Sequence, residues 1–177
     1  MATVYTYLPG LVTGDALTYP IVMRAGGLNV DDYVMTLEVK DDEEFAIGDL
    51  VMVTTGTLLL DQTAAKDFTA FGVVYDSNRN FATMEKNGVT VSKTATTGFK
   101  DGDKIDILLL VPGMILSLDH DGTAAIDVGD DVRAAAGGQC AALAAIATDV
   151  DPRAKIGTCL SLGVGTGTRG RIAVMIK

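Results

Sequence analysis

The sequence contains one histidine, His120, which lies between two aspartates in Leu118-Asp119-His120-Asp121-Gly122. A histidine beside carboxylates can act as a general base, but it then needs a nucleophile or a substrate group within reach. The sequence offers no such partner beyond generic serines. One histidine and two separated cysteines also cannot complete a zinc site unaided. We therefore predict that His120 lies in an exposed turn and that the protein is not an enzyme.

Two segments share letters with ligand-binding motifs but lack their full chemistry. Gly165-Thr166-Gly167-Thr168-Arg169-Gly170 matches a dinucleotide-binding loop, which must be followed by a helix, whereas a strand-like segment follows here. Asp101-Gly102-Asp103-Lys104-Ile105-Asp106 has the alternating aspartates of a calcium loop. It lacks the central glycine, and Pro112 stands where the twelfth-position glutamate would be. We predict that the first segment is a hairpin loop and the second a solvated turn, and that neither binds a metal or a cofactor.

The other charged and thiol groups have simpler interpretations. Asp41-Asp42-Glu43-Glu44 is a run of like charges, which usually forms a solvated loop. Biotin- and lipoate-carrying domains present a modified lysine at a hairpin tip, in Met-Lys-Met or Asp-Lys-Ala. Lys104, in Gly102-Asp103-Lys104-Ile105, is the nearest approach to such a tip, but its neighbours do not match, so we expect no carrier role. Cys140 and Cys159 are too few for a disulfide framework, so we predict that both are small buried side chains in a reducing compartment.

Composition excludes several partners. The net charge of −9 comes from 23 acidic and 14 basic residues, and the basic ones are scattered along the chain. Nucleic acid binding needs clustered Lys and Arg, so we expect none. The longest apolar stretch, Ile107 to Leu118, is interrupted by Pro112-Gly113 and is too short to cross a bilayer, so we expect no membrane segment. Residues 1–20 have no basic start followed by an apolar run, and we expect no secretory signal.

Glycines punctuate the chain and indicate many short strands. The 20 glycines lie between short runs rich in Val, Ile, Thr and Leu, whereas sustained helical periodicity is almost absent. Asn87-Gly88 and Gly137-Gly138 are hairpin-type turn signals. The alanine-rich segment from Cys140 to Thr148 fits a short helix or a strand equally well. The predicted strands are Leu37–Val39, Leu50–Thr54, Phe71–Tyr75, Val89–Ser92, Lys104–Val111, Met114–Leu118, Ala124–Ile126, Ile156–Leu162 and Arg171–Ile176.

An internal repeat divides the chain. Ala46-Ile47-Gly48-Asp49-Leu50-Val51 is echoed by Asp127-Val128-Gly129-Asp130-Asp131-Val132, and an apolar-Gly-apolar strand follows each copy, around Gly72 and around Gly157. The copies then run into Val89–Val91 and Ile172–Val174. Glycine permits a positive φ and aspartate can bond nearby amides, so each unit turns the chain into a strand. The order predicts two related small β units, residues 41–111 and 112–177, which either fold separately or pack as one domain.

Residues 1–40 have a different character. Pro9-Gly10, Tyr19-Pro20 and Gly26-Gly27 leave no room for a long regular element, which predicts an extended N-terminal arm. Its tyrosines and leucines are too apolar for a solvated tail, so we expect the arm to lie on another surface, its own domain or, by preference, a partner. The residues that we expect to make these contacts, with a partner or with another subunit, are Tyr5, Tyr7, Leu8 and Leu11.

With this repeat, the chain resembles the capsid decoration (cement) proteins of tailed bacteriophages. The resemblance lies in Val128–Val132, Ile156–Leu160 and Gly170–Val174, with a weaker copy from Ile47 to Val91. It implies a small β-barrel or sandwich that forms homotrimers, binds the major capsid protein on the outside of an icosahedral virion, and stabilises the shell. It also implies that the chain is in the host cytoplasm during assembly. Two units in one chain depart from the shortest family members.

The sequence also allows one alternative function. Small β modules of tails and fibres bind carbohydrate ligands, and such a module would normally present exposed aromatic platforms. The chain has no Trp and only 6% aromatic residues, which favours the decoration protein over the carbohydrate-binding module.

Overall fold

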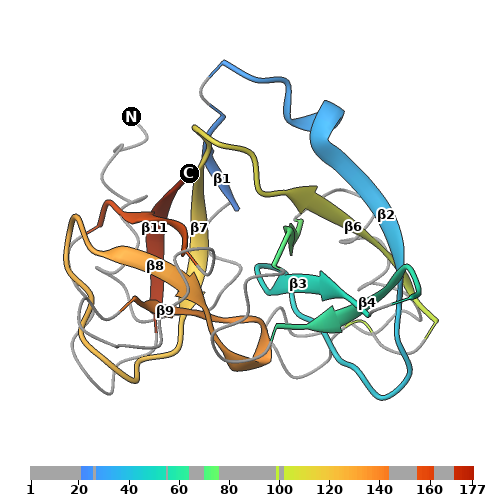
Figure 1. Ribbon diagram of the computed structural model, residues 1–177. Coiled ribbons are helices and arrows are strands. Elements are labelled where there is room, and N and C mark those ends of the chain that lie inside the picture. The colour runs from blue at the N-terminus through green and yellow to red at the C-terminus, as the bar shows by residue number, and fades with distance from the viewer. Residues whose placement is uncertain are drawn as a thin grey trace, which may run out of the picture.

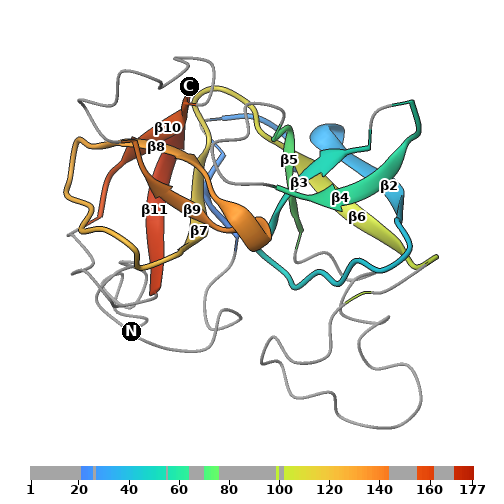
Figure 2. The same cartoon turned by 60° about the horizontal axis from the view of Figure 1, so that its bottom comes forward.

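The computed structural model describes residues 21–25, 27–54, 56–63, 70–75, 99, 102–143, 155–161 and 170–177. This part of the chain is mainly β, and its helical elements are two short 3₁₀ helices, η2 (Val30–Tyr33) and η3 (Ala136–Gly138). The strands form two groups that lie side by side (Figures 1 and 2). The predicted fold class, mainly β with two small units, is confirmed. Within the described residues, no helix has the length and apolar character needed to span a bilayer.

The first group is a closed five-stranded barrel, barrel 1. Around it the strands follow the order β2-β4-β3-β5-β6, and β6 closes the ring by pairing with β2. All neighbours are antiparallel except β2 and β4, which are parallel. The first and last strands of the unit are therefore neighbours in space. The strands are β2 (Val34–Val39), β3 (Leu50–Val53), β4 (Leu59–Gln62), β5 (Gly72–Val74) and β6 (Lys104–Leu109).

The second group, barrel 2, has the same circuit. Its strands pair in the ring β7-β9-β8-β10-β11, and again only the first and third strands, β7 and β9, are parallel. One further strand, β1 (Val22–Arg24), pairs with β7 from outside this ring. The two predicted units are thus two copies of one fold, and β1 is an addition to the second. The ring strands are β7 (Ile115–His120), β8 (Asp131–Ala134), β9 (Cys140–Ala142), β10 (Lys155–Cys159) and β11 (Gly170–Ile176).

The repeated Gly-Asp turn has the same local chemistry in both barrels. The carboxylates of Asp49 and Asp130 each accept a hydrogen bond from the backbone N–H three residues earlier, at 2.7 and 2.8 Å. The preceding glycines, Gly48 and Gly129, have φ values of 99° and 97°, which disfavour any residue with a side chain. Each turn leads directly into the second strand of its barrel, as the sequence pattern predicts.

Each barrel also contains a strand glycine that close packing requires. A Cβ at Gly72 would collide with the side chain of Ile107, and a Cβ at Gly157 would collide with the backbone oxygen of Met175. Both glycines stand opposite the end of the last strand of their barrel. Neither has a positive φ, so it is the close approach of the neighbouring strand that excludes a side chain here.

A continuous hydrophobic core joins the two barrels. It consists mainly of Ile, Leu and Val side chains, as expected for a chain with no Trp. At the junction, the buried hydroxyl of Thr63 in barrel 1 donates to the Ala135 carbonyl of barrel 2 at 2.8 Å. The guanidinium of Arg171, also buried, donates to the Ser117 carbonyl at 2.7 Å and lies against Gly48 of barrel 1. The two barrels are therefore packed against each other through a common core.

The structure corrects the boundary between the arm and the first unit. The range 1–40 contains β2, which completes barrel 1, and β1, which pairs with barrel 2. Barrel 1 starts at Val34 rather than at residue 41, because the ring cannot close without β2. Residues 1–20, with Tyr5, Tyr7, Leu8 and Leu11, lie outside the described residues. The predicted boundary between the two units, 111/112, falls in the link between β6 and β7.

Most predicted strands are present, but several differ. β1 and β4 were not predicted, β8 was indicated only by the repeated Gly-Asp turn, and Ala124–Ile126 is not a strand of either barrel. The counterpart of β11 is β6, not Val89–Val91, because β6 pairs with β2 as β11 pairs with β7. Val89–Ser92 and the Asn87-Gly88 turn lie outside the described residues. The segment from Cys140 begins as a strand, β9, and the Gly137-Gly138 turn joins it to β8 in an antiparallel hairpin.

Candidate functional site

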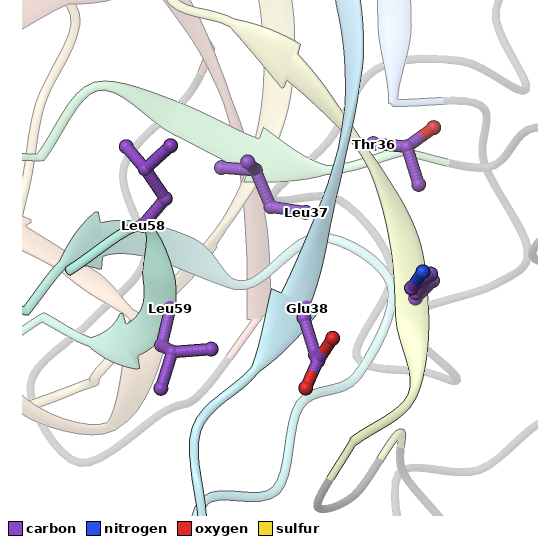
Figure 3. A pocket seen from close by; sticks show the side chains of 6 residues that line it. Thr36, Leu37, Glu38, Leu58 and Leu59 are labelled. Atoms are coloured by element: carbon purple, nitrogen blue, oxygen red, sulfur yellow. The ribbon is translucent and has the colours of Figure 1, made fainter.

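The described surface has a groove of about 460 Å³ on barrel 1. Leu37 on β2 and Leu58, just before β4, lie on its two sides (Figure 3), and Glu38 and Lys104 add one charge of each sign. Glu38 and Lys104 occupy opposite positions in the β2–β6 ladder. Thr36 and Leu59 complete the lining. With one carboxylate and one ammonium group, the groove lacks an acid–base pair of carboxylates and is suited to apolar and backbone contacts.

Two exposed apolar side chains belong to the region of this groove. Leu58 is 74% exposed, and Met35, on β2 beside the groove, is 39% exposed. In the run Leu58-Leu59-Leu60, alternation would put Leu58 on the same face as the buried Leu60, but Leu58 precedes β4 and its side chain is therefore not held against the core. That run was the sequence feature from which the groove could have been predicted, and it was missed.

A second apolar spot lies on barrel 2. Val128 is 57% exposed in the Gly-Asp turn, and Leu160 follows β10. The two are close because the Gly129 N–H donates to the Cys159 carbonyl at 2.9 Å. This spot consists of two side chains, whereas six residues line the groove on barrel 1, so the groove is the stronger candidate site.

His120 is buried, which overturns the prediction of an exposed turn. It is the last residue of β7 and is 0% exposed. Its Nδ1 accepts a hydrogen bond from the Gly122 N–H at 3.2 Å, so the ring carries its proton on Nε2. Nε2 has no hydrogen-bond partner among the described residues, and the Asp121 carboxylate lies 3.8 Å away. The flanking aspartates suggested exposure, but strand alternation turns the histidine inward with Leu116 and Leu118.

The burial of His120 predicts that stability falls on mild acidification. Burial lowers the pKa of His120 below its ordinary value of 6.5, although the charges of Asp121 and Asp119 act in the opposite direction. As the pH falls below 6.5, the unfolded chain takes up this proton before the folded chain does, so unfolding becomes more favourable. Urea midpoints measured between about pH 7.5 and pH 5.5 should therefore decrease.

The matched control is His120→Val, because Val39 occupies the corresponding position of β2. Lys40 N–H donates to Leu60 O just as Asp121 N–H donates to Cys140 O, at 3.1 and 2.9 Å, which places Val39 and His120 in register. The valine variant should lose most of the pH dependence in this range. An unchanged slope would assign the effect to other groups.

The two cysteines are buried, as predicted. Neither Cys140 nor Cys159 forms a disulfide, and burial raises the pKa of both thiols. Protonated, inaccessible thiols are poor nucleophiles and poor metal ligands. The described residues contain no group of three or more His, Cys, Asp or Glu side chains arranged to hold a metal ion.

The acidic and glycine-rich motifs have structural places. Asp106 lies in β6, nearly buried, and accepts a hydrogen bond from the Thr36 hydroxyl at 2.8 Å, so this end of the calcium-like motif is not a solvated turn. Asp41-Asp42-Glu43-Glu44 is mostly exposed, as predicted, and the neighbouring Lys40 pairs with Asp61 at 2.7 Å. Burial and a hydrogen bond with Asp61 raise the pKa of Glu43. The dinucleotide-like loop lies outside the described residues up to Gly170, where a strand, not a helix, begins.

The fold defines a two-barrel β protein, and similar chains are found among solved structures. No protein-family model matches the chain, and no curated protein matches it. Among solved structures it is similar to the N base of head fiber gp8.5 of bacteriophage phi29, with 12% sequence identity and a TM-score of 0.44. The match covers 80% of this chain and 93% of that one. A TM-score this low is not sufficient to transfer a function.

Proposed function

We propose that this chain is a virion structural protein, a decoration or cement protein that binds the outer surface of an icosahedral bacteriophage capsid and stabilises it. The observation that carries the proposal is that the three segments with the sequence resemblance all form structural parts of barrel 2. Val128–Val132 forms the turn into β8, Ile156–Leu160 contains most of β10, and Gly170–Val174 opens β11. These segments form strands and a turn of barrel 2, and barrel 1 has the same strand order.

The expected partner is the major capsid protein, and the expected assembly is a homotrimer on the capsid exterior. The proposed role is contact rather than catalysis, without cofactor, nucleic acid or membrane. A net charge of −9 favours solubility and opposes non-specific association until a matching surface is met. Tyr5, Tyr7, Leu8 and Leu11 are the proposed contacts of the N-terminal arm with the capsid or with another subunit.

The proposed mechanism is mechanical. Strands closed into two rings that share a core make a stiff body, which can hold neighbouring capsid subunits at fixed separations. A single docking site need only be weak, because an oligomer that engages several sites gains effective concentration. Attachment of the stiff body across capsid subunits would oppose their separation under the pressure of packaged DNA.

Co-sedimentation tests the proposal. The purified full chain is mixed with shells of its own virus, before and after expansion, and the pelleted protein is measured. We expect saturable binding to expanded shells, and expanded shells with bound protein should survive heating that opens bare shells. Equal failure to bind either kind of shell would reject the decoration role. Retention on immobilised polysaccharide together with that failure would favour the carbohydrate-binding alternative.

A further inference from the structure

The duplicated fold allows each position of barrel 1 to be compared with its counterpart in barrel 2. Val39 and His120 correspond, as shown above, and counting back along the two strands pairs Leu37 with Leu118 and Met35 with Leu116. Side chains at alternate positions share a face, so these residues all point the same way in their barrels. A difference in solvent exposure between two corresponding residues therefore shows that one barrel is covered by other parts of the chain where the other barrel is not.

Barrel 2 is covered at all three positions, whereas barrel 1 is covered at Val39, half-covered at Leu37 and open at Met35. Leu116 and Leu118 are both 0% exposed, whereas Met35 is 39% exposed. β4 meets β2 only at Glu38 and Val39, so the N-terminal half of β2 extends beyond β4 (Figure 1). The groove lined by Leu37 and Leu58 lies along this half. Barrel 1 thus presents an apolar opening that its duplicate does not have.

The element that covers this edge in barrel 2 is β1. β9 meets β7 only at His120, and beyond that point β1 takes over the same edge, with Val22 opposite Leu116. The Ser117 N–H donates to the Ile21 carbonyl at 2.8 Å, and Ile21 is fully buried. The occupant is therefore a short, extended, apolar stretch of chain that adds one antiparallel strand. This is strand addition of the kind used in peptide recognition.

We propose that the groove of barrel 1 receives an equivalent strand, the segment Thr3–Leu8 from the arm of a second copy of this chain. This inference rests on the proposed function, which requires copies to be joined. Thr3-Val4-Tyr5-Thr6-Tyr7-Leu8 is uncharged and consists largely of β-branched and aromatic residues, which favour strands. The charges of Glu38 and Lys104 are opposite, so the groove has no net charge and an uncharged strand fits it.

The arm has the reach that such an exchange needs. Residues 9–20 separate the segment from Ile21, which is anchored on barrel 2, and when extended they span up to roughly 40 Å. Each copy has one arm and one groove. Head-to-tail exchange can therefore close into a ring in which every groove is filled, and the proposed trimer is such a ring.

The solution mass of the full-length protein, without capsid shells, tests this inference. Wild type should have the mass of at least two copies of the 18.4 kDa chain, and of three copies if the ring is the proposed trimer. Leu58→Glu places a charge in the groove at an exposed position that folding does not depend on, and it should weaken association about 100-fold. The double variant Tyr5→Asp/Tyr7→Asp should be equally weak. Val128→Glu, which adds the same charge at an exposed apolar site of barrel 2, should associate as wild type does.

Mixing the two defective proteins completes the test. The Leu58→Glu copy keeps its arm and the Tyr5→Asp/Tyr7→Asp copy keeps its groove, so an equimolar mixture should form one-to-one pairs that neither forms alone. A monomeric wild type, an associated Leu58→Glu variant, a monomeric Val128→Glu variant or a mixture that does not pair would each overturn the inference. A wild-type monomer that still binds expanded shells would leave the decoration role standing and reject only the arm exchange.

Discussion

Replacing Gly157 with alanine is expected to destabilise the protein by about 3 kcal/mol, a large part of the total stability of an ordinary domain. The new Cβ would collide with the backbone oxygen of Met175 and would lie 2.7 Å from a methyl carbon of Val174. A backbone atom in a paired strand cannot rotate away, so β10 and β11 would have to separate. That separation would disrupt the ring of barrel 2.

The corresponding change in barrel 1, Gly72→Ala, should cost less, about 2 kcal/mol. There the nearest obstacle is the Cγ2 methyl group of Ile107, and the backbone oxygen of Leu108 is 3.0 Å away. Adding Ile107→Val should restore little, because valine keeps the Cγ2 methyl group that collides. Adding Ile107→Ala removes the collision but leaves a cavity. A larger loss of stability in Gly157→Ala than in Gly72→Ala would show that a collision with backbone costs more than a collision with a side chain.

Gly102→Ala is the control for both variants. A Cβ there meets no atom within 4 Å, so its cost comes only from the φ of 74° and should be about 1 kcal/mol. Because the chain has no Trp, urea unfolding is best followed by far-UV circular dichroism. Equal midpoints for Gly157→Ala and Gly102→Ala would contradict the close strand approach.

The repeat could be predicted from sequence because its chemistry is local. Asp49 and Asp130 accept hydrogen bonds from amides three residues away, so the spacing of glycine, aspartate and the following apolar residues contains the whole turn. The short strands that follow were also found, since glycine bounds them on both sides. The pairing partner of each strand is not local, and this is why Val89–Val91 was matched to β11 in place of β6.

The groove and the buried histidine depend on register and on closure of the rings. The alternation of Leu116, Leu118 and His120 was visible in the sequence, but two flanking aspartates outweighed it. The exposure of Leu58 follows from where β4 starts, and β4 was not predicted because Leu59–Gln62 is short and lacks a regular alternation. The membership of β2 in barrel 1 becomes evident only when β4 and β6 are placed on its two sides.

The contact between the barrels makes a second large effect predictable. Gly137 and Gly138 are adjacent, with φ values of 69° and 74°, so alanine meets nearly the same backbone strain at either position. Their surroundings differ. A Cβ at Gly138 would lie 2.7 Å from the Cβ of Asp49 in barrel 1, whereas at Gly137 its nearest neighbour would be Gln62 at 4.0 Å.

Gly138→Ala should therefore cost about 3 kcal/mol and Gly137→Ala about 1 kcal/mol, and the difference measures the contact between the barrels. Asp49 cannot withdraw freely, because its carboxylate accepts the hydrogen bond that holds the turn before β3. The Thr63–Ala135 hydrogen bond lies just before η3 and should weaken as the barrels move apart. Urea unfolding of Gly138→Ala should then lose cooperativity and show a shallower or divided transition, while Gly137→Ala keeps the single wild-type transition. Indistinguishable curves for the two variants would mean that the barrels fold and stand independently of this junction.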